Sequence, residues 1–165
     1  MEESLEDLEK RQRSAVVSIA KTWVGTPYRS GSAVRGPDGG VDCANLPAAV
    51  YAEAGVIKPF QVEFYPQDWH LHRSTERYLD QVKKLAFELP PDALPMPGDL
   101  VVWKFGRCFS HGAIVVEWPR AVHAFIGGAC TMVNCEQEHR LKFVGEPGPN
   151  YGKPRERKFF TLWPR

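Results

Sequence analysis

Cys43 and two histidines downstream of it are the residues whose types and spacing best suit nucleophilic chemistry. Cys43 stands between a glycine-rich turn at residues 36–40 and a stretch at residues 44–54 whose apolar residues recur at helical spacing. This pattern predicts a sulfur at or near a helix N-terminus, where backbone amides and the helix macrodipole favour the thiolate. A thiolate attacks acyl carbons when a histidine reaches it in the fold. A cysteine hydrolase is therefore the working hypothesis.

His111 and His123 are the two histidines that could serve this cysteine. His111 opens the apolar run 112–116, which predicts a strand that begins beside the helix terminus, and it would carry the Cys43 proton to the leaving amine. His123 follows twelve residues later, after a predicted turn at residues 117–120. On neighbouring antiparallel strands, His123 would bond the His111 ring nitrogen that faces away from the sulfur and fix its tautomer. The alternative is that His123 is a packed core residue on an alternating strand.

Other polar residues near these motifs allow more than one interpretation. Asp42 is either the N-cap of the Cys43 helix or a carboxylate that meets a substrate ammonium group. His70 and His72 lie two residues apart with no third ligand close by, so we interpret them as surface or substrate-rim histidines. We interpret His139, in a polar segment, as solvated.

The cysteine content predicts reduced thiols. Four cysteines in a chain of 165 residues do not make a disulfide framework, and none of them forms a CysXxxXxxCys pair. A zinc site is conceivable, but the spacings match no common one, and its ligands would be Cys108, His111, Cys130 and Cys135. We interpret the three cysteines other than Cys43 as packed thiols, and the sequence calls for no metal and no cofactor.

Composition places the chain among globular proteins. With 165 residues, 43% hydrophobic and 25% charged, it predicts one domain over residues 1–165. A formal net charge of +1 gives no reason to expect nucleic acid or an anionic membrane as a partner. No apolar run approaches the roughly 18 residues of a membrane-spanning helix. The acidic N-terminus lacks the apolar core of a signal peptide, so we expect synthesis in the cytoplasm without one.

The order of predicted elements indicates an α+β fold with a mostly antiparallel sheet. Helical spacing precedes the strands, and a Pro-rich segment at residues 89–99 separates the two parts. Helices are predicted at 5–23, 44–54 and 75–88, and strands at 100–105, 112–118, 121–126, 130–135 and 158–163. Residues 25–42, 58–74 and 145–157 are predicted to be irregular.

Several of these motifs, taken in order, resemble the NlpC-type cell-wall cysteine peptidases, and within them the branch found in phages and prophages. The matching segments span most of the chain: WVGTPYR at 23–29, DCANL at 42–46, PQDWHLHR at 66–73, PGDLVVWKFGR at 97–107, SHGAIVV at 110–116 and VHA at 122–124. Any one of these is a weak signal, whereas their order and distances together are specific. Many family members have Ser-Gly after the cysteine, whereas this chain has Ala44 and Asn45, so the resemblance does not define the cleft there.

The resemblance implies a papain-like fold in which helices, one of them carrying the nucleophile, pack on the antiparallel sheet. It implies Cys43 as nucleophile, His111 as general base and His123 as the orienting third residue. It further implies that Tyr28 lies close to the nucleophile and polarises the scissile carbonyl or lines the substrate site, and that Asp42 can meet a free amino group. The implied substrate is the peptidoglycan stem peptide, cut between γ-D-glutamate and a diamino acid, with action at the cell wall.

Two other functions stay open on the sequence. The chain could be a phage tail-tip or assembly component whose papain-like domain is mainly structural and contacts phage tail proteins, a reading that suits a protein without a signal peptide. It could also be an amidase or acyltransferase that uses Cys43, His111 and His123 on a small molecule or lipid.

Overall fold

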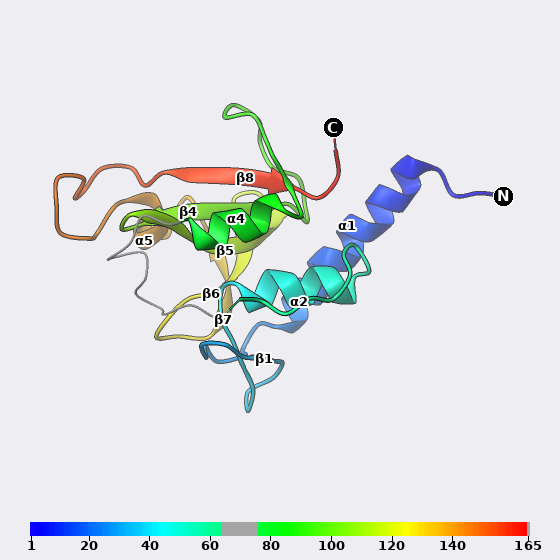
Figure 1. The fold of residues 1–165 in the computed structure, drawn as a ribbon, viewed down its shortest axis with the longest axis horizontal. Coiled ribbons are helices and arrows are strands. Elements are labelled where there is room, and N and C mark those ends of the chain that lie inside the picture. The colour runs from blue at the N-terminus through cyan, green and yellow to red at the C-terminus, as the bar shows by residue number, and fades with distance from the viewer. Residues whose placement is uncertain (64–75, 165) are drawn as a thin grey trace.

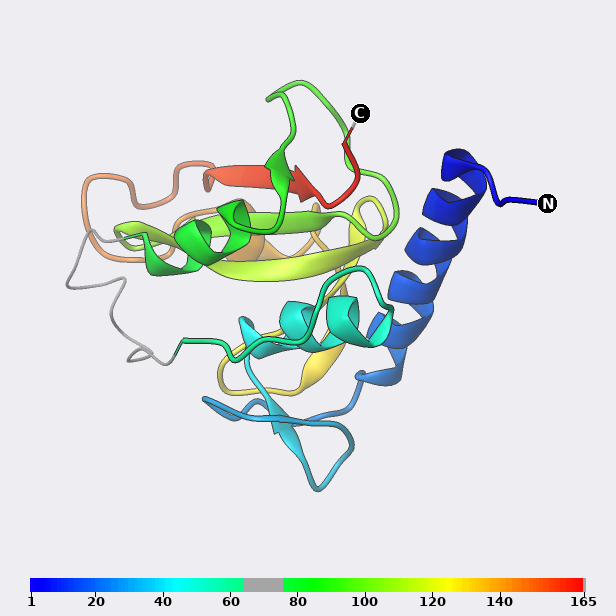
Figure 2. The same ribbon diagram turned by 45° about the vertical axis from the view of Figure 1, so that its right-hand side comes forward.

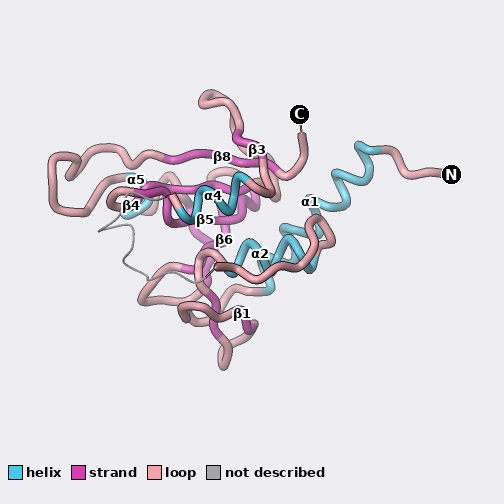
Figure 3. The backbone as a smooth tube through the Cα atoms, in the orientation of Figure 1, coloured by secondary structure: helices cyan, strands magenta, loops and turns pink. Residues whose placement is uncertain are grey.

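The computed structural model of the chain describes residues 1–63 and 76–164. Its elements follow in the order α1 (Leu5–Thr22), β1 (Ala33–Val34), β2 (Gly40–Val41), α2 (Asn45–Glu53), α4 (Arg77–Lys83), β3 (Phe87–Glu88), β4 (Leu100–Phe105), β5 (Cys108–Glu117), β6 (Arg120–Ala124), β7 (Cys130–Asn134), α5 (His139–Lys142) and β8 (Arg157–Thr161) (Figures 1 and 3). Helices α1 and α2 come before the main strands, as the sequence predicts.

The main sheet has six strands in the order β3-β8-β4-β5-β6-β7, and its neighbouring strands are all antiparallel. The hairpins β4–β5, β5–β6 and β6–β7 run from its centre to the β7 edge, and the C-terminal strand β8 lies on the other side of β4 (Figure 1). The α+β class with an antiparallel sheet is confirmed. Strands β4, β5 and β6 are the ones that carry the candidate histidines and their neighbours.

Both faces of the sheet are buried, and the alternation of side chains along β4 shows how. Leu100 and Val102 pack into a cluster with residues of α1, α2 and α4, whereas Val101 and Trp103 pack into a second cluster with Leu141 of α5. Successive side chains of a strand point to opposite faces, so an uninterrupted apolar run covers both. Figure 2 shows α2 lying between the sheet and the small β1–β2 ladder, with α1 alongside it.

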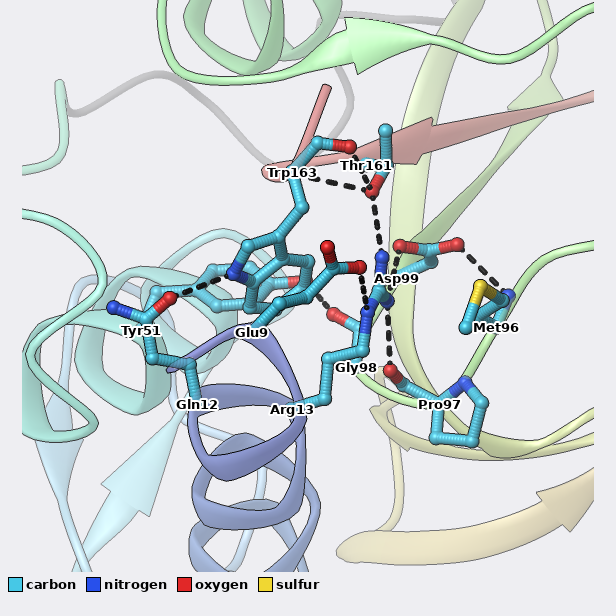
Figure 4. Close-up of polar contacts among 10 residues, drawn as sticks. All are labelled: Glu9, Gln12, Arg13, Tyr51, Met96, Pro97, Gly98, Asp99, Thr161 and Trp163. Atoms are coloured by element: carbon cyan, nitrogen blue, oxygen red, sulfur yellow. Dashed lines mark hydrogen bonds and ion pairs between the residues drawn. The ribbon is translucent and has the colours of Figure 1, made fainter. Parts of the chain in front are cut away.

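A buried ion pair fastens helix α1 to the sheet (Figure 4). The Arg13 guanidinium donates to the Asp99 carboxylate over 2.8 Å, to the Pro97 carbonyl over 2.9 Å and to the Thr161 hydroxyl over 3.2 Å. Asp99 is fully buried, and its second oxygen accepts the Met96 N–H at 2.8 Å. Charge-assisted hydrogen bonds of this kind orient both partners, so α1 has a fixed position against the start of β4.

Some predicted boundaries differ from the structure. The helix predicted at 75–88 ends at Lys83, because residues 87–88 pair with β8 as strand β3; its first predicted residue, 75, lies outside the described residues. Strand β5 begins at Cys108 rather than 112, because Gly106 adopts a positive φ of 61° and closes a tight hairpin with β4. The ladder β1–β2 lies within a predicted loop, and helix α5 was not predicted.

Candidate active site

Cys43 lies two residues before helix α2, and its neighbour Asp42 caps that helix. One Asp42 carboxylate oxygen accepts the backbone N–H groups of Ala44 at 3.1 Å and Asn45 at 2.7 Å, and the Asn45 side-chain amide at 3.0 Å. The other oxygen accepts the Gly31 N–H at 2.7 Å. These contacts match the capping role that the sequence allowed for Asp42, and they fix the backbone on both sides of the sulfur.

His111 and His123 are joined by a hydrogen bond of 2.9 Å between His111 Nε2 and His123 Nδ1. Val115 of β5 pairs with Ala121 of β6, so the alternating residues 111 and 123 point to the same face of the sheet. His111 is the fourth residue of β5 rather than the residue preceding a strand. The bond leaves His111 Nδ1 as the ring nitrogen that is available to a reacting group.

Three aromatic rings enclose His111, and the sequence analysis did not predict them at this place. Trp103 stacks on it with ring centroids 5.7 Å apart, and the Phe105 and Phe125 rings meet it edge-on at 5.8 Å and 4.9 Å. Behind them lie two guanidinium groups: Arg155 is 3.7 Å from the Phe105 ring centroid and Arg140 is 4.3 Å from that of Phe125. The rings hold the imidazole in place and exclude water from it.

Burial keeps both imidazoles neutral. It lowers the pKa of His111 well below its ordinary 6.5, with further lowering by the charge that His123 carries once it is protonated in acid and by the charges of Arg155 and Arg140. Burial also lowers the pKa of His123 to about 4; the Arg140 charge adds to this effect and the Glu138 carboxylate opposes it. A neutral His123 accepts or donates one hydrogen bond at Nδ1, as the pairing with His111 requires.

The Cys43 thiol does not have the lowered pKa that the sequence predicted. Burial and the neighbouring Asp42 charge raise the pKa of the thiol to about 12, and the Gly112 N–H that faces the sulfur lowers it less than they raise it. The sulfur donates to the Ser110 carbonyl at 3.5 Å. The prediction considered the helix terminus but neither the burial of the sulfur nor the carboxylate next to it, and in this structure the thiol is therefore protonated at neutral pH.

Cys43 and His111 line one cavity of about 300 Å³. Its wall also includes Tyr28 and Asp42, and Phe60 and Phe125 supply apolar surface. His123 is 3% exposed and stands behind His111 rather than in the wall. The structure thus gathers the five predicted site residues at one place: Cys43, His111, Tyr28 and Asp42 around the cavity, and His123 against His111.

The arrangement of these elements matches solved structures of known proteins. The fold consists of helices packed on a six-stranded antiparallel sheet, with a cysteine before α2 and a histidine on β5. The chain has the NlpC/p60 fold. Over 76% of this chain and 92% of the other, it superposes on the NlpC/p60 domain of the peptidoglycan hydrolase SagA with a TM-score of 0.53 and 19% identity.

Two mycobacterial proteins extend the comparison. The peptidoglycan hydrolase RipB from Mycobacterium tuberculosis is 16% identical, with a TM-score of 0.56 over 99% of this chain and 70% of RipB. RipD from the same organism, described as a non-catalytic NlpC/p60 protein adapted to peptidoglycan binding, is 12% identical with a TM-score of 0.54 over 92% of this chain and 98% of its own. No family model and no curated protein matches the sequence. The fold therefore occurs in proteins described as hydrolases and in one described as non-catalytic.

The remaining candidates lie apart from the cavity. Cys108, Cys130 and Cys135 are buried, reduced thiols, and within residues 1–63 and 76–164 no cluster of three or more metal-ligating side chains exists. His139 is exposed at the start of α5, with its ring 5.0 Å from that of Phe143. His70 and His72, with the rest of motif 66–73, lie outside the described residues. Among the described helices, none combines the length and the apolar character needed to traverse a bilayer.

Proposed function

We propose that the chain is a cysteine peptidase that hydrolyses peptidoglycan stem peptides, with residues 1–165 as one catalytic domain. The observation that carries this proposal is the shared cavity: Cys43, the one partly exposed cysteine among the four, and a histidine oriented by a second histidine line its wall. The fold it shares with SagA and RipB supports the cell wall as the site of action. A γ-D-glutamyl–diamino acid bond is the proposed target, and a phage tail is the proposed means of delivery.

The proposed mechanism uses the tautomer in which His111 Nε2 carries the proton shared with His123 Nδ1. With the Nε2–H of His111 donating to His123 Nδ1, the lone pair of His111 Nδ1 is free to act as a base. Nδ1 takes the thiol proton while the sulfur of Cys43 attacks the amide carbon, and it then gives this proton to the leaving amine nitrogen as the C–N bond breaks. Water, deprotonated at the same nitrogen, attacks the thioester and returns the thiol.

Tyr28 and the backbone of Cys43 have the proposed task of stabilising the oxyanion. The backbone N–H of Cys43 belongs to the same residue as the attacking sulfur, and Tyr28 lies in the cavity wall. A donor aimed at the developing oxyanion contributes on the order of 3 kcal/mol to the transition state. The Asp42 carboxylate already accepts hydrogen bonds from four N–H groups. We therefore propose that it attracts the substrate's amino group through its negative charge and not through a direct hydrogen bond.

Mass spectrometry of muropeptides released from purified sacculi tests the proposal. The wild-type protein is expected to release cleaved stem peptides, and Cys43→Ala and His111→Ala are expected to release none above the blank. His139→Ala, which changes an exposed histidine away from the cavity, serves as the matched control and should retain wild-type release. Equal release by wild type and Cys43→Ala would refute the mechanism.

Binding of peptidoglycan without cleavage is the second candidate. The raised pKa of the Cys43 thiol favours it, and so does the shared fold with RipD. In this case wild-type protein sediments with sacculi and releases no muropeptide. The amount of protein that sediments should then be the same for Cys43→Ala, because the thiol has no chemical task.

A further inference from the structure

A tyrosine from helix α4 connects the two halves of the candidate site. The Tyr78 hydroxyl donates a hydrogen bond of 2.8 Å to the backbone carbonyl of Cys43. Tyr78 is 3% exposed, and α4 packs against strand β5, which carries His111 (Figure 2). A single buried side chain thus contacts the backbone of the nucleophile from the element that covers the histidine strand.

The same hydroxyl lies against the residue that follows His111. A Cβ atom added to Gly112 would be 2.2 Å from the Tyr78 hydroxyl oxygen and 3.0 Å from its Cζ. Gly112 does not have a positive φ, so a glycine is required here by this contact and not by backbone conformation. The Gly112 N–H in turn faces the Cys43 sulfur. Tyr78 therefore sets the distance between the backbone of Cys43 and that of β5.

The start of α4 makes a second connection to the same strand. The Glu76 carboxylate accepts the Phe109 N–H at 2.9 Å, two residues before His111. With one end of α4 bonded to β5 and Tyr78 bonded to Cys43, movement of α2 relative to β5 requires that one of these two bonds break. Helix α4 thus acts as a brace between the sulfur and the imidazole.

We propose that Tyr78 is a positioning residue, which holds the Cys43 sulfur in line with His111 through the Cys43 carbonyl. This inference rests on the proposed function, because alignment matters only where the two side chains exchange a proton. Misplacement of reacting groups by about an ångström lowers reaction rates by up to about a hundredfold. The loss of one hydrogen bond of ordinary strength corresponds to a rate lowered by about tenfold.

Tyr78→Phe is the test, and the chain offers a closely matched control. Tyr51 is also buried, and its hydroxyl also donates to a backbone carbonyl at 2.8 Å, that of Gly98 (Figure 4). Both substitutions remove one hydroxyl and one hydrogen bond. Tyr78→Phe is expected to lower kcat on sacculi by about tenfold with KM little changed. Tyr51→Phe should keep the wild-type kcat, while its urea unfolding midpoint should fall by as much as that of Tyr78→Phe. Equal kcat in the two variants overturns the proposal.

Alkylation of Cys43 by iodoacetamide gives a readout that does not depend on the substrate. At pH 7 the Cys43 thiol ionises only by transferring its proton to His111, so Tyr78→Phe should slow alkylation about tenfold. The difference in alkylation rate between the wild type and this variant should narrow toward pH 10, where hydroxide removes the thiol proton. If Tyr78→Phe merely loosened the fold, alkylation would instead increase, because Cys108, Cys130 and Cys135 would become exposed and would be labelled as well. If wild type leaves sacculi uncut, the proposed function fails, and the alkylation rates still decide the role of Tyr78.

Gly112→Ala provides an independent check through the same contact. In the wild-type background the new methyl group displaces the Tyr78 hydroxyl and should slow alkylation at least as much as Tyr78→Phe does. In the Tyr78→Phe background the nearest atom is absent, so the same substitution should have a smaller effect. If Gly112→Ala slowed alkylation by the same factor in both backgrounds, Gly112 and Tyr78 would act separately, and the proposed role of α4 as a brace would be contradicted.

Discussion

Replacing His123 by glutamine should make the stability of the protein less sensitive to acid. His123 is buried, and its pKa falls from the ordinary 6.5 to about 4. The unfolded chain takes up this proton as the pH falls through 6.5, whereas the folded chain takes it up only near 4. Above pH 6.5 both states are neutral and the group has no effect on stability. Between 6.5 and 4 the folded state loses stability, by up to about 3 kcal/mol at 1.36 kcal/mol per pKa unit.

Urea unfolding at pH 7.5, 6, 5 and 4 measures this loss. Glutamine retains a side-chain amide opposite His111 but has no group that titrates, so the wild-type free energy of unfolding should fall more steeply than that of His123→Gln. The difference between the two curves should grow by as much as about 3 kcal/mol between pH 7.5 and pH 4. His139→Gln, at an exposed site, should follow the wild type. Parallel curves for wild type and His123→Gln would refute the argument that burial keeps this imidazole neutral.

Asp99→Asn should lower the free energy of unfolding by about 3 kcal/mol in urea, because it removes the buried carboxylate and leaves the buried Arg13 guanidinium with the partly exposed Glu9 as its counterion. Gly39→Ala should lower it by about 1–3 kcal/mol, since the new Cβ would lie 1.9 Å from a backbone carbonyl oxygen of β1, whereas Gly145→Ala, with nothing within 4 Å, should have little effect. If the chain cleaves sacculi, the acid limb of kcat/KM against pH should lie below 6.5, because burial lowers the pKa of His111; a limb at or above 6.5 would contradict this.

The sequence predicted those helices and strands whose structure is decided by the spacing of apolar residues and turn residues within the element itself. Apolar spacing located α1 and α2, and Pro47 falls in the first turn of α2, where a proline is tolerated. Gly55, with a positive φ of 73°, follows the helix as predicted. All four strands β4, β5, β6 and β7 exist as predicted, because the turns between them contain glycine or proline, but β5 begins four residues early because the Gly106 turn is tight. The error at residues 87–88 has another cause, since pairing with the distant strand β8 decides their structure.

The candidate site was only partly predictable, for a similar reason. The bond between His111 and His123 follows from two neighbouring strands in a simple register, and the sequence could anticipate it. Two of the three rings around His111 come from β4 and the third, Phe125, directly follows β6, and Tyr78 reaches Cys43 across 35 residues of chain. No periodic pattern signals such contacts. Their residues read in the sequence as ordinary core positions.

The electrostatic state of the site determines how its chemistry would proceed. The pKa of the Cys43 thiol is raised to about 12 and that of His111 is well below 6.5, so transferring the proton at rest costs more than about 7 kcal/mol before the two charges attract each other. Attraction between unit charges about 4 Å apart near a protein surface returns about 4 kcal/mol. The ion pair is therefore scarce in the free protein, and in the proposed chemistry the proton moves to His111 as the sulfur bonds to the carbon of a substrate or of iodoacetamide. Alignment then matters more than prior ionisation, so the proposed chemistry depends on Tyr78 and the rings around His111 rather than on the terminus of α2.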